Sequence, residues 1–305
     1  MSRPSEAVLA ECRAILGRGS KSFAAASRLL PARLRDPVAG YYAFCRVSDD
    51  AIDESADPLS ALAALSERLD RIVEGRPADH PADVALAWVV REHGIGRAPL
   101  DALLEGYRWD VERRRYEDLE GVRAYAARVA ASVGVVMTRI MGERDRETLA
   151  RAADLGVAMQ LTNIARDVGE DARAGRLYLP LGWLREEGVE PDAFVADPRP
   201  LEGVRVAVCR LLDHADALYR RAGLGIPRLP ADCRVAIAAA AAIYRDIGRV
   251  IRAGRYDSIS SRAYTSSGRK AWLAASAIPA RFTTVPNAAP RAAPLPEVRF
   301  LIEKP

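Results

Sequence analysis

Aromatic residues, cysteine and histidine are all scarce in this sequence of 305 residues. Phe, Trp and Tyr together make up 6%, and there are four cysteines and three histidines. No two cysteines are close enough in sequence to form a Cys-x-x-Cys redox pair or a zinc knuckle. We therefore expect Cys12, Cys45, Cys209 and Cys233 to be reduced thiols of a cytoplasmic protein.

The sequence also lacks a long hydrophobic run and a strong excess of one charge. The longest apolar stretch, residues 235–244, is too short to span a bilayer, and the N-terminus has acidic residues but no hydrophobic signal-peptide core. The formal net charge of +4 is well short of the clustered charge of a dedicated nucleic-acid-binding protein. We expect a soluble or peripheral protein that does not bind nucleic acid.

Helix-forming patterns, by contrast, recur along the chain. Half of the residues are hydrophobic, enough for a sizeable core, and much of that half is alanine, which favours helices over strands. No convincing period-two run or mid-chain linker occurs, so we predict an all-α helical bundle with a single domain over residues 1–282. Asp36-Pro37 is a typical helix start, and residues 120–141 are predicted to form one long helix. Residues 283–305 are rich in Pro and Ala without periodicity, which predicts a disordered tail.

Two polar rows stand out within mostly apolar helices. Tyr42, Arg46, Asp49 and Asp53 are spaced four, three and four residues apart, and flanking apolar residues pack elsewhere. A second row has spacings of three, four and four. These intervals place each row on one side of its helix. The second row consists of Gln160, Asn163, Asp167 and Asp171.

A single pair of carboxylates four residues apart on an exposed helix would not mark a site. The repulsion between them destabilises the helix by only ~0.2–0.5 kcal/mol, so such a pair can occur without a function. If both rows face one cavity, however, unit charges ~6 Å apart at an effective dielectric constant of ~20 repel by ~3 kcal/mol. Oxygen-ligated divalent cations would relieve this repulsion, and Mg²⁺ fits best, with Mn²⁺ as an alternative. Because Mg²⁺ fills its remaining positions with water and phosphate, the pattern favours a phosphorylated ligand. Four arginines could neutralise phosphate oxygens: Arg46, Arg166, Arg173 and Arg176.

An apolar helical bundle with a Mg²⁺-diphosphate mouth is suited to a prenyl diphosphate substrate. The metal would assist departure of the diphosphate, and a dry pocket would protect the resulting carbocation from water. The sequence YYAFCRVSDDAID, residues 41–53, and the sequence AMQLTNIARDVGEDARAGRLYLP, residues 158–180, contain the two rows. These motifs resemble the two aspartate motifs of the squalene/phytoene synthase family of head-to-head prenyl transferases, and in particular its bacterial phytoene synthases. The similarity covers roughly residues 8–282.

The resemblance implies an isoprenoid-synthase-type fold around a central apolar cavity. It also implies that two geranylgeranyl diphosphates are joined through a cyclopropyl (prephytoene) diphosphate to give phytoene for carotenoid biosynthesis, with release of diphosphate and without NADPH. The expected metal ligands are Asp49, Asp53, Asn163, Asp167 and Asp171.

Further site residues follow from the resemblance and from the two rows. Tyr125 matches a tyrosine in the cavity and counts with the four aspartates as catalytic, whereas Ala127 stands where some relatives have a second aromatic residue. Ser20, Lys21, Ser22 and Phe23 match a flap near the substrate. The remaining substrate-binding candidates are Tyr42, Arg46, Gln160, Asn163, Arg166, Arg176, Tyr244, Arg262 and Lys270.

Three other functions remain open. Dehydrosqualene or squalene synthase performs the same chemistry on farnesyl diphosphate, and squalene synthase also needs NADPH. A head-to-tail prenyl transferase is favoured by Asp49-Asp50-x-x-Asp53 but not by the second motif. A non-catalytic scaffold is disfavoured because both acidic rows are intact. Since the expected product is an insoluble hydrocarbon, we also expect peripheral association with the inner face of the cell membrane; the pattern predicts no particular oligomeric state.

Overall fold

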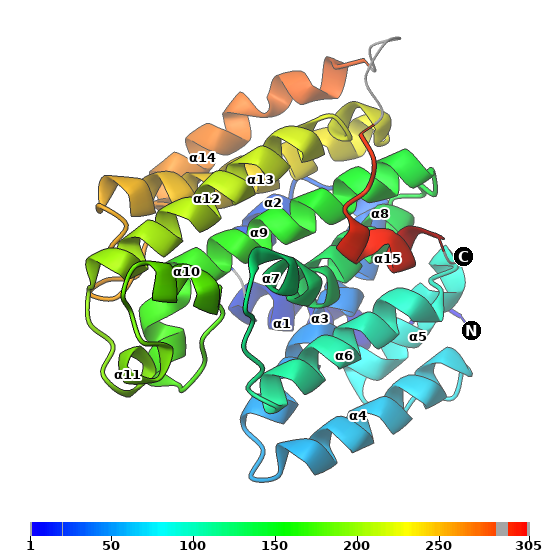
Figure 1. The fold of residues 1–305 in the computed structure, drawn as a ribbon. Coiled ribbons are helices and arrows are strands. Elements are labelled where there is room, and N and C mark those ends of the chain that lie inside the picture. Colours follow the sequence, from blue (N-terminus) through cyan, green and yellow to red (C-terminus); the bar gives the residue numbers. More distant parts are fainter. Residues whose placement is uncertain (1, 20, 285–291, 304–305) are drawn as a thin grey trace.

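The computed structural model describes residues 2–19, 21–284 and 292–303 of the chain. These residues contain helices and no strand, which confirms the predicted all-α fold (Figure 1). The N-terminal half comprises α1 (Glu6–Gly19), α2 (Lys21–Ser27), α3 (Ala32–Asp53), α4 (Pro58–Val73), α5 (Pro81–His93), α6 (Arg97–Val111), α7 (Leu119–Ala126), η1 (Ala127–Ala131) and α8 (Ser132–Ile140). The C-terminal half comprises α9 (Arg146–Arg173), α10 (Leu181–Glu186), α11 (Pro191–Ala196), α12 (Glu202–Gly223), η2 (Ile226–Arg228), α13 (Ala231–Ala253), α14 (Ser267–Ser276), η3 (Ile278–Phe282), η4 (Pro296–Val298) and α15 (Arg299–Glu303).

Helix α9 is the central element of the bundle and packs against α8, η1, α12 and α13 (Figure 1). The side chain of Asp145 caps its N-terminus by accepting a hydrogen bond from the Thr148 amide. Glycine lets neighbouring helices approach closely: a Cβ atom at Gly156 would lie 2.5 Å from the Ala130 carbonyl oxygen, and one at Gly134 would lie 2.7 Å from that of Ala152. This close packing fixes the helix that carries the second polar row.

Helix α3 carries the first polar row and begins earlier than predicted. It starts at Ala32, so Pro37 lies inside the helix rather than at its first position. The carboxylate of Asp36 does not cap the helix but forms an ion pair with Arg13, with 2.6 Å between Nη1 and Oδ1. Buried Leu34 and Val38 place both sides of the proline against the core, which holds the first turns in helical form.

The long helix predicted over residues 120–141 is interrupted. Residues 119–140 are helical, but Ala127–Ala131 form a π-helical segment between α7 and α8. Such segments insert one extra residue per turn and often occur at functional sites. Here the segment begins two residues after Tyr125.

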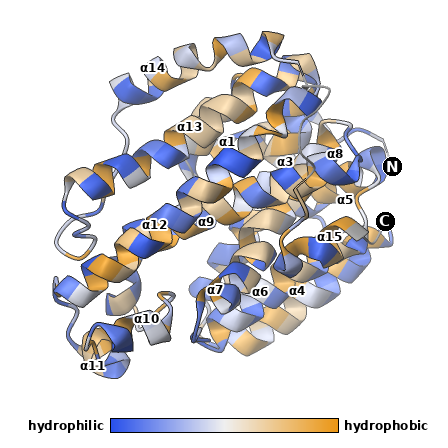
Figure 2. Cartoon of the chain, turned by 45° about the horizontal axis from the view of Figure 1, so that its top comes forward, coloured by the Kyte–Doolittle hydropathy of each residue, from blue (hydrophilic) through white to orange (hydrophobic). Residues whose placement is uncertain are grey.

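The helices enclose two hydrophobic clusters, one around α9 and α12 and the other around α1, α3, α5 and α6. Most helices carry both hydrophilic and hydrophobic residues (Figure 2), as expected for helices with one face in the core. No helix in the described part of the chain is long and apolar enough to cross a membrane. The clusters meet along α8 and α9, where the cavities described below are found.

The C-terminal segment differs from the predicted disordered tail. Residues 292–303 form η4 and α15, and Leu295, Val298, Leu301 and Ile302 are buried in the larger cluster. Two arginine side chains also hold the segment. Arg151 Nη2 donates to the Ala292 carbonyl over 2.8 Å and Arg221 Nη2 to the Ala293 carbonyl over 2.8 Å. The prediction is therefore wrong for residues 292–303, because its apolar residues are too few to show a period; residues 285–291 lie outside the described part.

Replacing Leu301 by Ala tests the contribution of this segment to stability. Leu301 is fully buried, so Leu301→Ala is expected to lower the free energy of unfolding by about 2–5 kcal/mol. Chemical denaturation measures this change. Arg299→Ala is the matched control, because Arg299 lies on the exposed side of the same helix, and it should change stability by less than about 0.5 kcal/mol. Equal, small effects of both substitutions would show that the segment does not pack as described.

Candidate active site

The N-terminal parts of the two polar rows line one cavity of about 360 Å³, whereas Asp53, Asp167 and Asp171 are not among its lining residues. Helix α3 contributes Tyr42, Arg46 and Asp49 to its lining, and α9 contributes Gln160 and Asn163. The cavity brings together residues that are more than a hundred positions apart in the sequence. Within the first row, Arg46 is held by Asp50, with 2.9 Å between its Nε and the carboxylate Oδ2.

Arg176 connects the C-terminal ends of the two rows. Its Nη2 donates to Oδ1 of Asp53 over 2.6 Å, and it lines a small pocket together with Asp171. Burial raises the pKa of both Asp110 and Asp171, and the positive charge of Arg176 offsets part of this rise at each carboxyl group. One guanidinium group therefore lies among carboxylates of α3, α6 and α9.

Asp167 is held by two arginines instead. Arg166 Nε donates to its Oδ1 over 2.7 Å, and Arg262 Nε donates to the same oxygen over 2.8 Å. Burial favours a higher pKa for Asp167, but the hydrogen bonds from Arg166 and Arg262 outweigh it and lower the pKa below its ordinary value. The loop that carries Arg262 is fixed by Arg173, whose Nη2 donates to the Ile259 carbonyl over 2.7 Å. Arg173 thus has a structural contact in place of the phosphate contact considered from the sequence.

For Asp49 and Asp171, nearby positive charge does not offset the effect of burial on the pKa. Burial, and next the charge of Asp53, raise the pKa of Asp49 to about 6. Burial, and next the charge of Asp167, raise the pKa of Asp171 to about 7. Carboxyl groups that resist ionisation in the folded protein indicate a site whose negative charge is stabilised by a ligand.

Asp110 on α6 is a site residue that the sequence did not reveal. Its carboxylate accepts hydrogen bonds from the hydroxyl groups of Tyr125, over 2.9 Å, and Tyr178, over 2.6 Å. The two tyrosine rings stack with centroids 5.0 Å apart. Because Asp110 is an isolated acidic residue on its helix face, no spacing pattern pointed to it. The structure therefore gives Tyr125 a definite role in orienting Asp110.

The pKa of Asp110 leads to a prediction about stability. Burial raises this pKa from 3.8 to about 6, so the folded protein binds more protons than the unfolded chain between these values, and stability falls as pH rises through this window. In metal-free protein, Asp110→Asn is expected to be more stable than the wild type above pH ~6 by about 1–3 kcal/mol, and equally stable below pH ~4. Thermal unfolding across this pH range in EDTA measures the difference. Lower stability of the variant at every pH would contradict the assignment.

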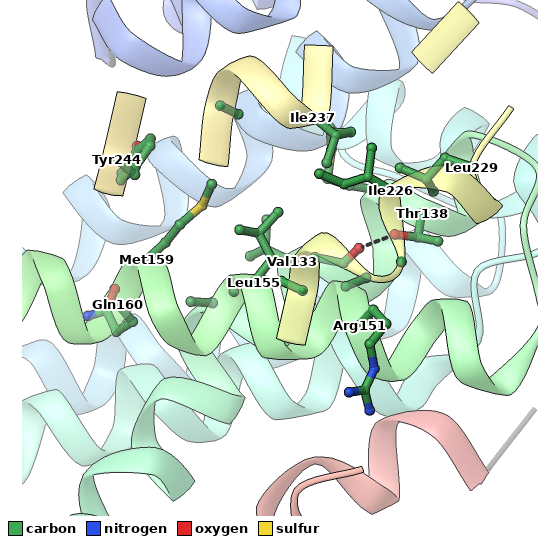
Figure 3. Close-up of a pocket in the computed structure, with 18 of the residues that line it drawn as sticks. Val133, Thr138, Arg151, Leu155, Met159, Gln160, Ile226, Leu229, Ile237 and Tyr244 are labelled. Carbon is green, nitrogen blue, oxygen red and sulfur yellow. Dashed lines mark hydrogen bonds between the residues drawn. The ribbon is translucent and has the colours of Figure 1, made fainter. Parts of the chain in front are cut away.

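Behind the polar cavity lies an apolar cavity of about 250 Å³ (Figure 3). Gln160 and Tyr244 lie at one end, and Thr138, Ile226 and Leu229 lie at the other (Figure 3). The two cavities share part of their lining, so they adjoin. The shared residues are Val129, Val133, Gln160 and Asn163.

The remaining predicted residues lie at different distances from these cavities. Phe23 and Tyr244 line the apolar cavity, and Phe23 stacks on Tyr42 with ring centroids 5.3 Å apart. Lys270 lies on α14 and is not among the residues that line either cavity. Ser20 lies outside the described residues, as do the side chains of Lys21 and Ser22.

The donor set is compatible with a hard cation, although no three His, Cys, Asp or Glu side chains in the described residues are already grouped around one point. Instead, the carboxylates of Asp53 and Asp167 form ion pairs with arginines. Asn163 lines both cavities, and its amide oxygen Oδ1 is buried without a hydrogen-bond partner. An unsatisfied buried oxygen is costly unless a ligand completes it. Oxygen donors of this kind suit Mg²⁺ or Mn²⁺.

An all-α bundle with acidic rows at the mouth of an apolar cavity defines a class of isoprenoid-synthesising proteins, and comparison with known proteins identifies the family. Residues 16–269 match the family model for squalene/phytoene synthase, and the chain belongs to that family. This confirms the predicted membership.

Relatives and solved structures agree with this assignment. The chain is 52% identical to a phytoene synthase from Rhodobacter capsulatus, over 98% of this chain and 90% of the relative. It is 42% identical to a 15-cis-phytoene synthase from Paracoccus sp., over 88% and 90%. Among solved structures, a dehydrosqualene synthase in complex with ligand superimposes with a TM-score of 0.81 at 32% identity, over 89% of this chain and 95% of that one.

Proposed function

We propose that the protein joins two molecules of geranylgeranyl diphosphate head to head, through a cyclopropyl diphosphate, to form phytoene and release diphosphate. The observation that carries the proposal is the direct junction of a polar cavity, lined by Arg46, Asp49 and Asn163, with a long apolar cavity. A diphosphate group suits the first cavity and a prenyl chain the second. The names of the relatives in Rhodobacter and Paracoccus favour this substrate and product.

The residues at the mouth hold the diphosphate in two ways: arginines contact its oxygens, and carboxylates bind the metal. Arg46, Arg176 and Arg262 already lie within ion-pair distance of carboxylates, so their positive charges are held ready for phosphate oxygens. We assign Mg²⁺, or Mn²⁺, to Asp49 and Asp53 on α3 and to three residues of α9. Bound there, the metal supplies Lewis-acid stabilisation of the departing diphosphate. The α9 residues are Asn163, Asp167 and Asp171.

The apolar cavity serves the prenyl chains and the carbocations. Its lining excludes water, which would otherwise capture a cation. The rings of Phe23 and Tyr244 line this cavity, and Tyr42 lines the mouth. Aromatic faces attract a cation within ~6 Å, so these three rings are placed to stabilise positive charge near the point of ionisation.

A dehydrosqualene synthase is the second candidate, because one of the structural neighbours is such an enzyme. Incubation with geranylgeranyl or farnesyl diphosphate, with Mg²⁺ or EDTA and with or without NADPH, separates the two. We expect a C40 hydrocarbon of the mass of phytoene, formed only with the divalent metal and independent of NADPH. A C30 product from farnesyl diphosphate alone would assign the protein to the second activity.

We also propose that the enzyme works peripherally at the cytoplasmic face of the cell membrane. The product is a hydrocarbon without a polar group, so it needs a lipid phase to leave the protein. Flotation with vesicles containing anionic phospholipid tests this. Recovery of the protein with the vesicles is expected, and its complete retention in the aqueous fraction would refute membrane association without touching the proposed chemistry.

A further inference from the structure

Helix α14 and the turn η3 expose large apolar side chains that no other element among the described residues covers. Trp272 is 56% exposed, Ile278 54% and Phe282 77%. Both elements pack on α13 and contact one another, so their outer sides form one face, here called the α14–η3 surface. In Figure 1 this face lies at the outer edge of the bundle, beyond α13. A cluster of exposed large apolar residues is typical of an interaction surface.

The residues of this surface itself carry positive charge only, although Arg269 is paired with Asp246 of α13, with 3.1 Å between Nε and Oδ1. Residues 258–296 contain no Asp or Glu, and α14 and η3 carry Arg269, Lys270 and Arg281. Arg281 is exposed beside Phe282. Aromatic and basic residues on one face are the combination by which peripheral proteins bind anionic lipid, since apolar groups enter the headgroup region and basic groups meet its negative charge.

The surface is continuous with the far end of the apolar cavity. η3 packs against η2, whose Ile226 lines that end together with Leu229. Arg234 joins the two segments: its Nε donates to the Leu229 carbonyl over 2.8 Å, and its Nη1 donates to the Thr283 carbonyl over 2.6 Å. The charged mouth lies at the opposite end, beside Gln160 and Asn163.

We propose that the α14–η3 surface docks on an anionic phospholipid bilayer and so sets the apolar end of the cavity against the membrane. The inference rests on the peripheral association proposed above and identifies the face that makes the contact. In this orientation the charged mouth stays in water, where diphosphate is released, and the hydrocarbon end of the cavity adjoins lipid. A second copy of the chain is the competing occupant of an exposed apolar face.

Tryptophan fluorescence gives a direct readout, because Trp272 is exposed whereas Trp88, Trp109 and Trp183 are each only 8% exposed. Vesicles of phosphatidylglycerol and phosphatidylcholine with brominated acyl chains should quench the wild-type protein, and Trp272→Phe should abolish most of the quenching. Trp272→Phe keeps an aromatic ring, so it should still float with the vesicles. Equal quenching of both proteins would place another face on the membrane and overturn the proposal.

The double variant Ile278→Ser/Phe282→Ser tests the contribution of the surface to binding. We expect its partition into anionic vesicles to fall about tenfold, with turnover in detergent micelles unchanged. The matched control is Leu59→Ser/Leu201→Ser, since Leu59 and Leu201 are also exposed, 65% and 39%, but lie on α4 and before α12. The control should float like the wild type.

The outcomes separate this inference from the association itself. If the wild type floats and the double variant floats equally well, the membrane binds elsewhere and the α14–η3 surface is excluded. If the wild type does not float, the peripheral association fails and the surface fails with it, while the detergent assay still reports on the chemistry. If light scattering shows a lipid-free dimer that the double variant dissociates, the surface belongs to a second copy.

Discussion

Asp171→Asn is expected to lower kcat/KM for geranylgeranyl diphosphate by at least about 10³-fold. The substitution keeps the shape of the side chain but removes the charge that we assign to the metal. A metal contributes several kcal/mol to transition-state stabilisation, and each ~1.4 kcal/mol corresponds to a factor of ten in rate. Product formation at saturating Mg²⁺ measures the effect.

The same variant should fold at least as well as the wild type. Burial and the neighbouring Asp167 raise the pKa of Asp171 to about 7, so the ionised carboxyl group is unfavourable in the metal-free protein, and removing the charge relieves this. Thermal unfolding in EDTA at pH 8 should therefore show no loss of stability. Asp213→Asn on α12 is the control, because Asp213 is exposed and lines neither cavity. The activity of this variant should stay within about twofold of the wild type. Wild-type activity of Asp171→Asn would remove this residue from the metal site.

The helical periodicity of the sequence was sufficient to predict both polar rows and the all-α fold. Spacing of three and four residues placed Asp49 near Gln160 and Asn163 once the two helices were assumed to face one cavity, and the polar cavity contains these three residues. The rows could be recognised in the sequence because each consists of polar residues at helical spacing within a mostly apolar helix. Their common cavity was an assumption, and electrostatics then gave the need for cations between the two rows.

What periodicity could not predict were contacts made by isolated residues. Asp110 has no acidic neighbour at helical spacing, so its position between Tyr125 and Tyr178 became visible only in three dimensions. Similarly, the packing of residues 292–303 depends on carbonyl groups that accept hydrogen bonds from Arg151 and Arg221, which lie 141 and 72 positions earlier in the chain. Local patterns describe one helix face at a time, and these contacts join several helices.

The depth of the apolar cavity leads to a prediction about chain length. Along α9 its lining runs from Asn163 at the mouth through Leu155 and Ala152 to Thr148, which is about 22 Å at 1.5 Å per residue. Geranylgeranyl exceeds farnesyl by one five-carbon unit, roughly the length of one helical turn, ~5 Å. Ala152 lies about 16 Å from the mouth on the same scale, so a larger side chain there would occupy the space of the last unit.

Ala152→Phe is therefore expected to lower kcat/KM for geranylgeranyl diphosphate about 100-fold while changing that for farnesyl diphosphate less than about tenfold. The ring has room in the cavity, which limits the cost in stability to about 1–3 kcal/mol. Competition between the two substrates, with C40 and C30 products distinguished by mass, measures the switch. Ala152→Ser is the control, because it alters the same position without filling it and should keep the wild-type preference. If Ala152→Phe retained that preference while remaining folded, the prenyl chain would not extend to this depth, and the end of the cavity near Thr148 would have no part in selecting the substrate.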